Sequence, residues 1–123
     1  MANMMNSQSM AGLNTTTIGI PATDTYTIQG TVQTTNQTTA ATQGPGGGTG
    51  TGTGGSKSLS QVVVTIKQNN TTIYTSSPGD RGFYTTVAAT AGDIISVITT
   101  SSATQDKGLN DIQTTIQVFE GVI

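Results

Sequence analysis

The chain has 123 residues, enough for one domain with one core. Its formal net charge is −2 and only 8% of its residues are charged, so it offers no basic surface for nucleic acid. Its four cations are scattered along the sequence, which argues against binding to an anionic membrane. It contains no cysteine and no histidine, which excludes disulfides and thiolate zinc sites.

No apolar run approaches the roughly 20 residues that span a bilayer. The opening residues, MANMMNSQSM, lack the cationic and apolar regions of a signal peptide. We therefore expect a protein that is made in the cytoplasm of its host cell and used without secretion.

Residues 1–14 show no clear period of 2 or 3.6 residues. One interpretation is a disordered terminus. The other is an arm that becomes ordered against a partner, with contacts from Met4, Met5, Met10 and Leu13.

Two strands are expected next, over residues 15–20 and 25–34. The second alternates apolar and polar positions, which is typical of a strand with one buried side. The positions on its buried side are Tyr26, Ile28, Gly30 and Val32. Residues 35–58 then have almost no apolar content.

Strand signals follow in quick succession after residue 58, and 19 of the 24 Val, Ile, Leu and Phe residues lie there. The expected strands cover residues 59–68, 71–76, 82–90, 94–102 and 111–119. Turn residues separate them, namely Asn69-Asn70, Pro78-Gly79-Asp80 and Ala91-Gly92-Asp93. The apolar alternation places Val62, Val64, Ile66, Phe83, Val87, Ala89, Ile112, Ile116 and Val118 on inward faces.

Short strands at a spacing of about 8–12 residues predict an all-β protein, an antiparallel β-sandwich or barrel. We favour the sandwich, with an extended N-terminal arm. The expected organisation is an arm over residues 1–20 and a single sandwich domain over residues 21–123. Residues 35–58 are expected to form a long Gly/Thr-rich loop inside that domain.

The glycine run at residues 44–55, GPGGGTGTGTGG, contains a literal G-x-G-x-x-G pattern. A dinucleotide site needs a strand before this pattern and a helix after it, and here a polar tract precedes and a strand follows. The P-loop form also fails, since the run ends in Gly55-Ser56-Lys57-Ser58. We therefore expect a solvent-facing loop.

Catalytic chemistry has little support. The acidic residues fall mostly at turns or strand ends, where Asp is a common turn former. Asp106 and Asp111 are candidates for a calcium loop but lack its ligand spacing. A serine nucleophile would have no histidine base, and the pair Ser56 and Lys57 has no further support. We expect no enzymatic activity, no catalytic residues, no metal site and no cofactor.

Three segments resemble, in order, the jelly-roll of the C1q and tumour-necrosis-factor superfamily. They are VVVTIKQNNTTIY (62–74), AGDIISVITTSS (91–102) and IQTTIQVFEGV (112–122). A fourth, TYTIQGTV (25–32), resembles the Gly-x-Tyr strand of that fold without its leading glycine. The resemblance implies a jelly-roll topology.

The Thr/Gly/Asn-rich, cysteine-free sequence is also similar in style to head decoration (cement) proteins and fibre tips of tailed bacteriophages. That resemblance implies a homotrimer on the capsid surface of the virion, clamping neighbouring subunits of the major capsid protein. Independently, a small domain with few aromatic residues buries little apolar surface in its core, and such domains are commonly stabilised by forming oligomers. The capsid contacts are expected from Met4, Met5, Met10, Leu13, Ile18 and Ile20.

The alternative is a trimeric module at the tip of a head or tail fibre, binding a receptor or a glycan. It predicts that Tyr74 or Tyr84 is exposed at a rim.

Overall fold

The computed structural model describes residues 3–34, 61–101 and 112–123. Within these ranges the chain forms eight β-strands and no helix. They are β1 (Asn3–Ala11), β2 (Thr15–Gly19), β3 (Asp24–Thr34), β4 (Val62–Gln68), β5 (Thr71–Thr75), β6 (Gly82–Ala89), β7 (Ile94–Ser101) and β8 (Ile112–Glu120). The expected loop at residues 35–58 lies outside the described residues, and so do Asp106 and Asp111.

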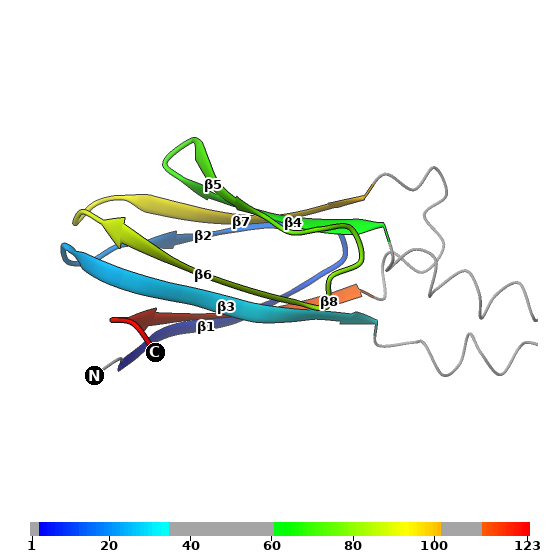
Figure 1. Ribbon diagram of the computed structural model, residues 1–123, viewed down its shortest axis with the longest axis horizontal. Helices are drawn as coiled ribbons and strands as arrows, with labels where there is room; N and C mark the ends of the chain where they lie inside the picture. Colours follow the sequence, from blue (N-terminus) through cyan, green and yellow to red (C-terminus); the bar gives the residue numbers. More distant parts are fainter. Residues whose placement is uncertain (1–2, 35–60, 102–111) are drawn as a thin grey trace, which may run out of the picture.

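The strands form two four-stranded sheets that pack face to face (Figure 1). Sheet A has the order β1-β8-β3-β6, and sheet B has the order β2-β7-β4-β5. Every pair is antiparallel, and β1 pairs with β8, β2 with β7, β3 with β6 and β4 with β5. The chain is thus one long hairpin wrapped around the sandwich, which is the strand order of an eight-stranded jelly-roll. The predicted antiparallel sandwich with jelly-roll topology is confirmed.

The core lies between the sheets and is built mainly from Ile and Val. Its fully buried side chains include Ile28 from β3, Ile66 from β4, Ile95 from β7 and Ile116 from β8. Successive side chains of a strand point to opposite faces, so an apolar residue at every second position produces this layer. The inward positions predicted for residues 25–34, 62–68 and 112–118 are confirmed.

Two of the predicted turns show the backbone conformation that their residues favour. Asn69, between β4 and β5, has a φ of 51° and is the one described non-glycine residue with a positive φ. Gly92, between β6 and β7, has a φ of 96°. Asn and Gly adopt the left-handed region at low cost, so Asn69 closes the β4–β5 hairpin tightly and Gly92 turns the chain from sheet A into sheet B.

The expected N-terminal arm over residues 1–20 is corrected, because most of this segment belongs to the sandwich. Residues 3–11 form β1, an edge strand of sheet A paired with β8, and residues 15–19 form β2, an edge strand of sheet B paired with β7. The period of β1 was hidden by two features. A bulge breaks the register between Met4 and Asn6, and two inward positions hold the polar Asn6 and Gln8.

Of these two polar side chains, Gln8 has a hydrogen-bond partner for its oxygen and Asn6 does not. Gln8 accepts a hydrogen bond from the hydroxyl of Thr16 on β2, which ties the two sheets together. The side-chain oxygen of Asn6 is buried and has no hydrogen-bond partner among the described residues. Backbone pairing with β8, rather than apolar side chains, holds most of β1 in place.

Candidate functional site

The outer face of sheet A carries no charged side chain in its three central rows. Read from β1 to β6, the rows are Ser9–Thr115–Thr31–Gly82, Ser7–Gln117–Gln29–Tyr84 and Met4–Phe119–Thr27–Thr86. Among the described residues the charged side chains sit at strand ends and turns, with the exception of Lys67 on β4. Neutral hydrogen-bonding groups cost less to desolvate than charges, so this face is suited to binding another molecule.

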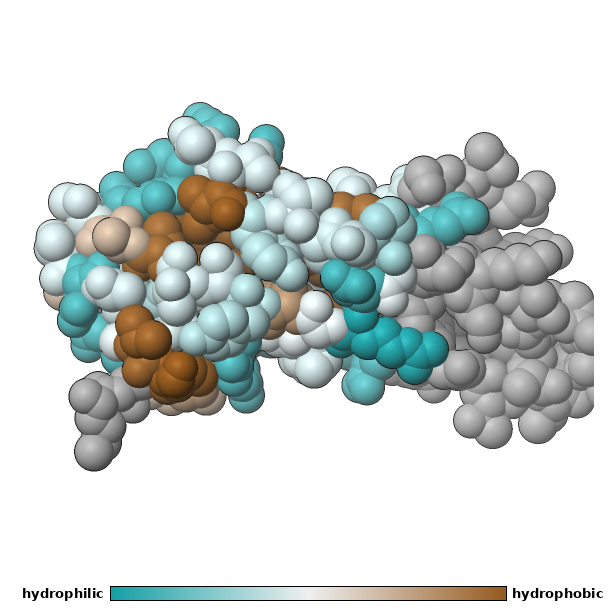
Figure 2. Space-filling view, in the orientation of Figure 1, coloured by the Kyte–Doolittle hydropathy of each residue, from teal (hydrophilic) through white to brown (hydrophobic). Residues whose placement is uncertain are grey.

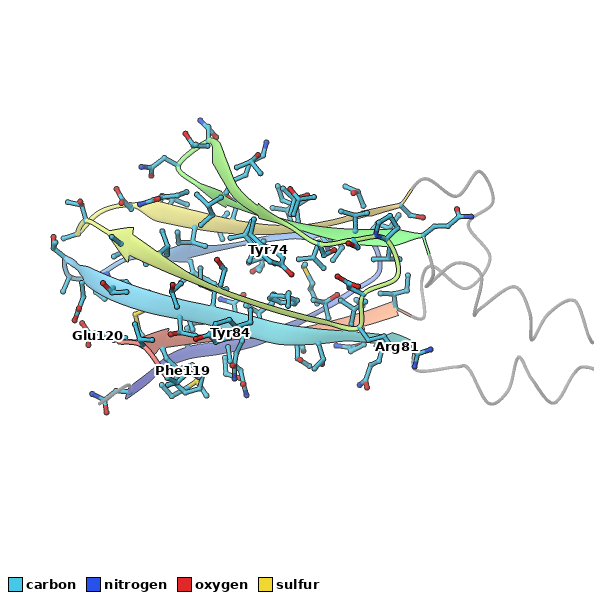
Figure 3. All side chains as sticks on the ribbon, in the orientation of Figure 1. Tyr74, Arg81, Tyr84, Phe119 and Glu120 are labelled. Atoms are coloured by element: carbon cyan, nitrogen blue, oxygen red, sulfur yellow. The ribbon has the colours of Figure 1, made fainter. Side chains whose placement is uncertain are left out.

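One end of this face is apolar. Met4 is 49% exposed and lies directly opposite Phe119 on β8. Val122 and Ile123, just beyond β8, are 60% and 52% exposed. We call these four residues the apolar corner. Figure 2 shows apolar surface gathered at this end of the sandwich, and Figure 3 places Phe119 there.

The segment after β8 folds back over the outer face. Thr27 points outward from β3 but is fully buried, and its hydroxyl donates a 2.7 Å hydrogen bond to the carbonyl of Gly121. The N–H of Gly121 in turn donates to the carbonyl of Thr25. Farther along, the hydroxyl of Tyr84 donates a 3.2 Å hydrogen bond to the carbonyl of Ile123. This segment therefore links the apolar corner to the aromatic ring on β6.

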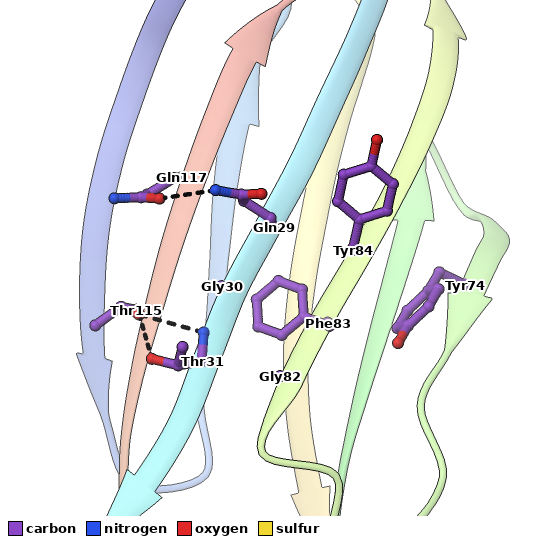
Figure 4. A pocket seen from close by; sticks show the side chains of 9 residues that line it. All are labelled: Gln29, Gly30, Thr31, Tyr74, Gly82, Phe83, Tyr84, Thr115 and Gln117. Carbon is purple, nitrogen blue, oxygen red and sulfur yellow. Dashed lines mark hydrogen bonds between the residues drawn. The ribbon is translucent and has the colours of Figure 1, made fainter. Parts of the chain in front are cut away.

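A hollow of about 620 Å³ lies at the other edge of sheet A, around the beginning of β6 (Figure 4). Three aromatic side chains line it, from Tyr74 on β5, Phe83 and Tyr84. The other lining residues are Gln29, Gly30, Thr31, Gly82, Thr115 and Gln117, and none of the nine is charged. Tyr84 is 49% exposed, so its ring is accessible from solvent.

The polar side chains of the hollow are paired with each other. The amide of Gln29 donates a 3.1 Å hydrogen bond to the amide oxygen of Gln117. The hydroxyls of Thr31 and Thr115 lie 2.7 Å apart, and Thr115 also accepts from the N–H of Thr31 at 3.2 Å. These pairings hold the four side chains in a fixed arrangement on neighbouring strands.

Two glycines on neighbouring strands shape the hollow, Gly30 of β3 and Gly82 of β6. A Cβ at Gly30 would lie 1.9 Å from the carbonyl oxygen of Thr115 and 2.4 Å from the ring of Phe83. A Cβ at Gly82 would meet its first neighbour at an ordinary 3.6 Å. Gly30 is therefore required by packing, whereas Gly82 leaves open space beside Tyr84.

Two titratable side chains, Asp93 and Tyr26, form hydrogen bonds that stabilise the fold. The backbone N–H of Thr90 and the amides of Gln68 and Asn69 donate to Asp93, and these bonds hold the pKa of its carboxyl below the usual range. Burial raises the pKa of the Tyr26 phenol, whose hydroxyl donates to the carbonyl of Ala22. In the ranges that the structure describes, no three His, Cys, Asp or Glu residues gather as metal ligands would.

No helix capable of crossing a membrane occurs in the described residues.

Of the six residues predicted to contact a capsid, three belong to the core. Met10, Ile18 and Ile20 are each at most 8% exposed and pack between the sheets. They contact other parts of this chain instead of a partner, because the strands that carry them complete the two sheets. Met5 is half-buried against the core.

The other two predicted contacts are accessible. Met4 lies in the apolar corner, and Leu13, between β1 and β2, is 42% exposed. They lie at opposite ends of β1, so the structure does not bring them together.

The two tyrosines singled out in the sequence both line the hollow, and Tyr84 is the exposed one. Sequence reasoning missed Gln29, Gln117, Thr31 and Thr115. Their outward positions on predicted strands were readable from the alternation, but their pairing depends on β3 and β8 being neighbours, which no local pattern shows.

No model of a known protein family matches the sequence, and no curated protein matches it. Several solved structures share its fold. The M60 catalytic domain with the CBM51-1 and CBM51-2 domains of Clostridium perfringens ZmpB matches with a TM-score of 0.60 and 8% identity, over 96% of this chain and 11% of that one. A structure of the CBM51-2 and INT domains of ZmpB matches with a TM-score of 0.58 and 7% identity, over 92% and 21%. The chain thus spans only a small part of these proteins.

GITRL from pika matches with a TM-score of 0.49 and 16% identity, over 86% of this chain and 72% of that one.

Proposed function

We propose that this protein is a non-enzymatic structural component of a tailed-bacteriophage virion, a decoration protein that docks on the major capsid protein and stabilises the head. The observation that carries the proposal is the apolar corner beside an uncharged sheet face. Met4, Val122 and Ile123 are each about half exposed or more, and Phe119 extends the same surface. Exposed apolar patches with a polar surround are typical of protein-binding sites.

The polar surround matches this use. Ser7, Gln117 and Gln29 form the next row of the sheet, and all three are neutral. A partner that covers this surface would desolvate amides and hydroxyls that it can satisfy with hydrogen bonds of its own.

A homotrimer is part of the proposal. The chain is small, and the edge strands of its sheets have backbone N–H and C=O groups that face away from the sheet. A neighbouring copy can pair with these groups or cover them. Light scattering of the purified protein at several concentrations measures this state. A trimer mass is the expected result, and a stable monomer at every concentration would remove the trimer from the proposal.

The structure changes how the capsid contact is tested. Deleting residues 2–14 would remove β1 and uncover β8, so loss of binding would not distinguish a contact from a folding defect. The test uses single lysine substitutions, Met4→Lys and Val122→Lys, in the full chain. Thr17→Lys is the matched control, since Thr17 is an exposed strand position in sheet B.

The measurement is co-sedimentation of each variant with capsids assembled without this chain, alongside its melting temperature. We expect Met4→Lys and Val122→Lys to weaken binding about tenfold or more, because each buries a charge at the contact. Thr17→Lys should bind like the wild type. Wild-type binding by both corner variants would refute the docking surface, and absence of the chain from purified virions would refute the virion assignment. Its copy number relative to the capsid protein separates a decoration protein from a fibre tip.

A further inference from the structure

We infer that the hollow beside Tyr84 is a binding site for a neutral carbohydrate. The inference goes beyond capsid docking, although the two surfaces adjoin: Gln29 and Gln117 line the hollow and also lie beside the apolar corner, and Tyr84 is hydrogen-bonded to Ile123. Its test uses the free chain, so the outcome does not depend on capsid binding.

The first argument is the aromatic surface. Tyr84 is half exposed, and Tyr74 reaches the same hollow from β5 of the other sheet (Figure 4). The C–H bonds on one face of a sugar ring carry partial positive charge and pack on the electron-rich face of an aromatic ring. The bond from the Tyr84 hydroxyl to the carbonyl of Ile123 restrains this ring before any ligand arrives.

The second argument is the set of hydrogen-bonding groups. The Gln29–Gln117 pair uses one amide N–H and one amide oxygen on each other. Whichever way the two amides are turned, one oxygen and one NH₂ group remain for a ligand, at the two ends of the bonded pair (Figure 4). Two well-separated hydroxyls of an oligosaccharide match these groups, since one can donate to the oxygen while the other accepts from the nitrogen.

The threonine pair adds a third group. One hydroxyl hydrogen is used between Thr31 and Thr115, so the other is left to donate to a ligand. The hollow thus offers an aromatic face, amide groups and a hydroxyl, with no charged side chain among its lining residues. A charged ligand would lose its hydration without gaining a counter-ion, which favours a neutral one.

The space for the ligand exists because residue 82 is glycine. Gly82 stands in the row next to Tyr84 and directly opposite Thr31. A side chain there would enter the hollow while its Cβ makes only ordinary contact. Gly82→Leu therefore fills the site and leaves the sheet intact, which makes it a sharp probe.

The test is saturation-transfer NMR with the full chain and four sugars: cellotriose, maltotriose, tri-N-acetylchitotriose and the negatively charged 3′-sialyllactose. A Ser/Thr hexapeptide is included as a non-sugar probe. We expect at least one neutral trisaccharide to bind, and Gly82→Leu and Tyr84→Ala each to weaken that binding about tenfold or more. Tyr84→Phe keeps the ring and should stay within about threefold of the wild type. Thr17→Ala, on sheet B, should change nothing.

Three results would overturn the inference. The first is no saturation transfer to any neutral trisaccharide. The second is sugar binding that Gly82→Leu leaves unchanged in a folded variant, which would place the sugar elsewhere. The third is binding of the peptide or of 3′-sialyllactose alone, which would assign the hollow to another ligand class.

Discussion

The ring of Phe83 occupies the space in which a side chain at Gly30 would stand. The two residues face each other in the register of β3 and β6, and a Cβ at Gly30 would lie 2.4 Å from the ring. The same Cβ would approach the carbonyl oxygen of Thr115 to 1.9 Å. Because one obstacle is backbone, the strand itself would have to move.

Gly30→Ala should therefore destabilise the fold by about 3 kcal/mol, at the upper end of overpacking effects. Gly82→Ala is the matched control, since its new Cβ makes ordinary contact, and it should change stability by less than about 0.5 kcal/mol. Urea unfolding of both variants measures the difference. Equal midpoints for Gly30→Ala and the wild type would contradict the packing that we describe.

Two buried threonines should respond in opposite directions to the same substitution. The hydroxyl of Thr114 is buried without a partner among the described residues, whereas that of Thr99 donates to the carbonyl of Gly12 and accepts from the N–H of Asn14. Thr114→Val should stabilise the protein by about 1 kcal/mol, because it removes an unsatisfied polar group.

Thr99→Val should destabilise it by about 1–2 kcal/mol, because the Asn14 N–H would lose its partner. Thermal or urea unfolding of both variants measures the two changes. Each variant is the control for the other, because the substitution is the same and both threonines are buried. A loss of stability in Thr114→Val would indicate that its hydroxyl has a partner.

Asp93 should make stability depend on pH in the acid range. Its carboxyl accepts hydrogen bonds from Thr90, Gln68 and Asn69, which lower its pKa from the ordinary 3.8. The unfolded chain then binds a proton more readily, so this contribution is present above about pH 4 and is lost as the pH falls through the lower folded pKa. Asp93→Asn should remove this part of the acid dependence.

The measurement is urea unfolding of the wild type and Asp93→Asn from about pH 6 to about pH 2. The stability gap between them should narrow towards low pH. A gap that stays constant over the whole range would show that Asp93 makes no pH-dependent contribution.

The glycine run should be dispensable for folding. Deleting residues 46–54 shortens the connection between Thr34 and Val62, and each doubling of a loop costs only about 0.6 kcal/mol in closure entropy. The melting temperature should therefore change by a few degrees at most. Loss of cooperative unfolding in this deletion would show that the run belongs to the folded unit.

Local patterns predicted most of the strands. The alternation through Tyr26, Ile28 and Val32 anticipated β3, and the stretch from Ile112 to Val118 anticipated β8. Asn69 marked the β4–β5 turn, because asparagine adopts positive φ easily. These features depend on neighbours in the sequence, and the sequence displays them directly.

The missed strand, β1, lacks such a pattern. Asn6 and Gln8 fill inward positions, and its place depends on backbone pairing with β8, more than 100 residues away in the sequence. Once β1 and β2 complete the sheets, Met10, Ile18 and Ile20 become core residues, Met5 is half-buried, and Met4 and Leu13 stay exposed.

The sequence by itself determined an all-β chain, the positions of most strands and turns, and the absence of basic, cysteine or histidine chemistry. Only the tertiary structure decided that Phe119 meets Met4 and that Gln29 meets Gln117. The physical reason is that period and turn chemistry act over a few residues, whereas strand pairing joins segments far apart in the chain. Both proposed binding surfaces consist of side chains that become neighbours only through that pairing.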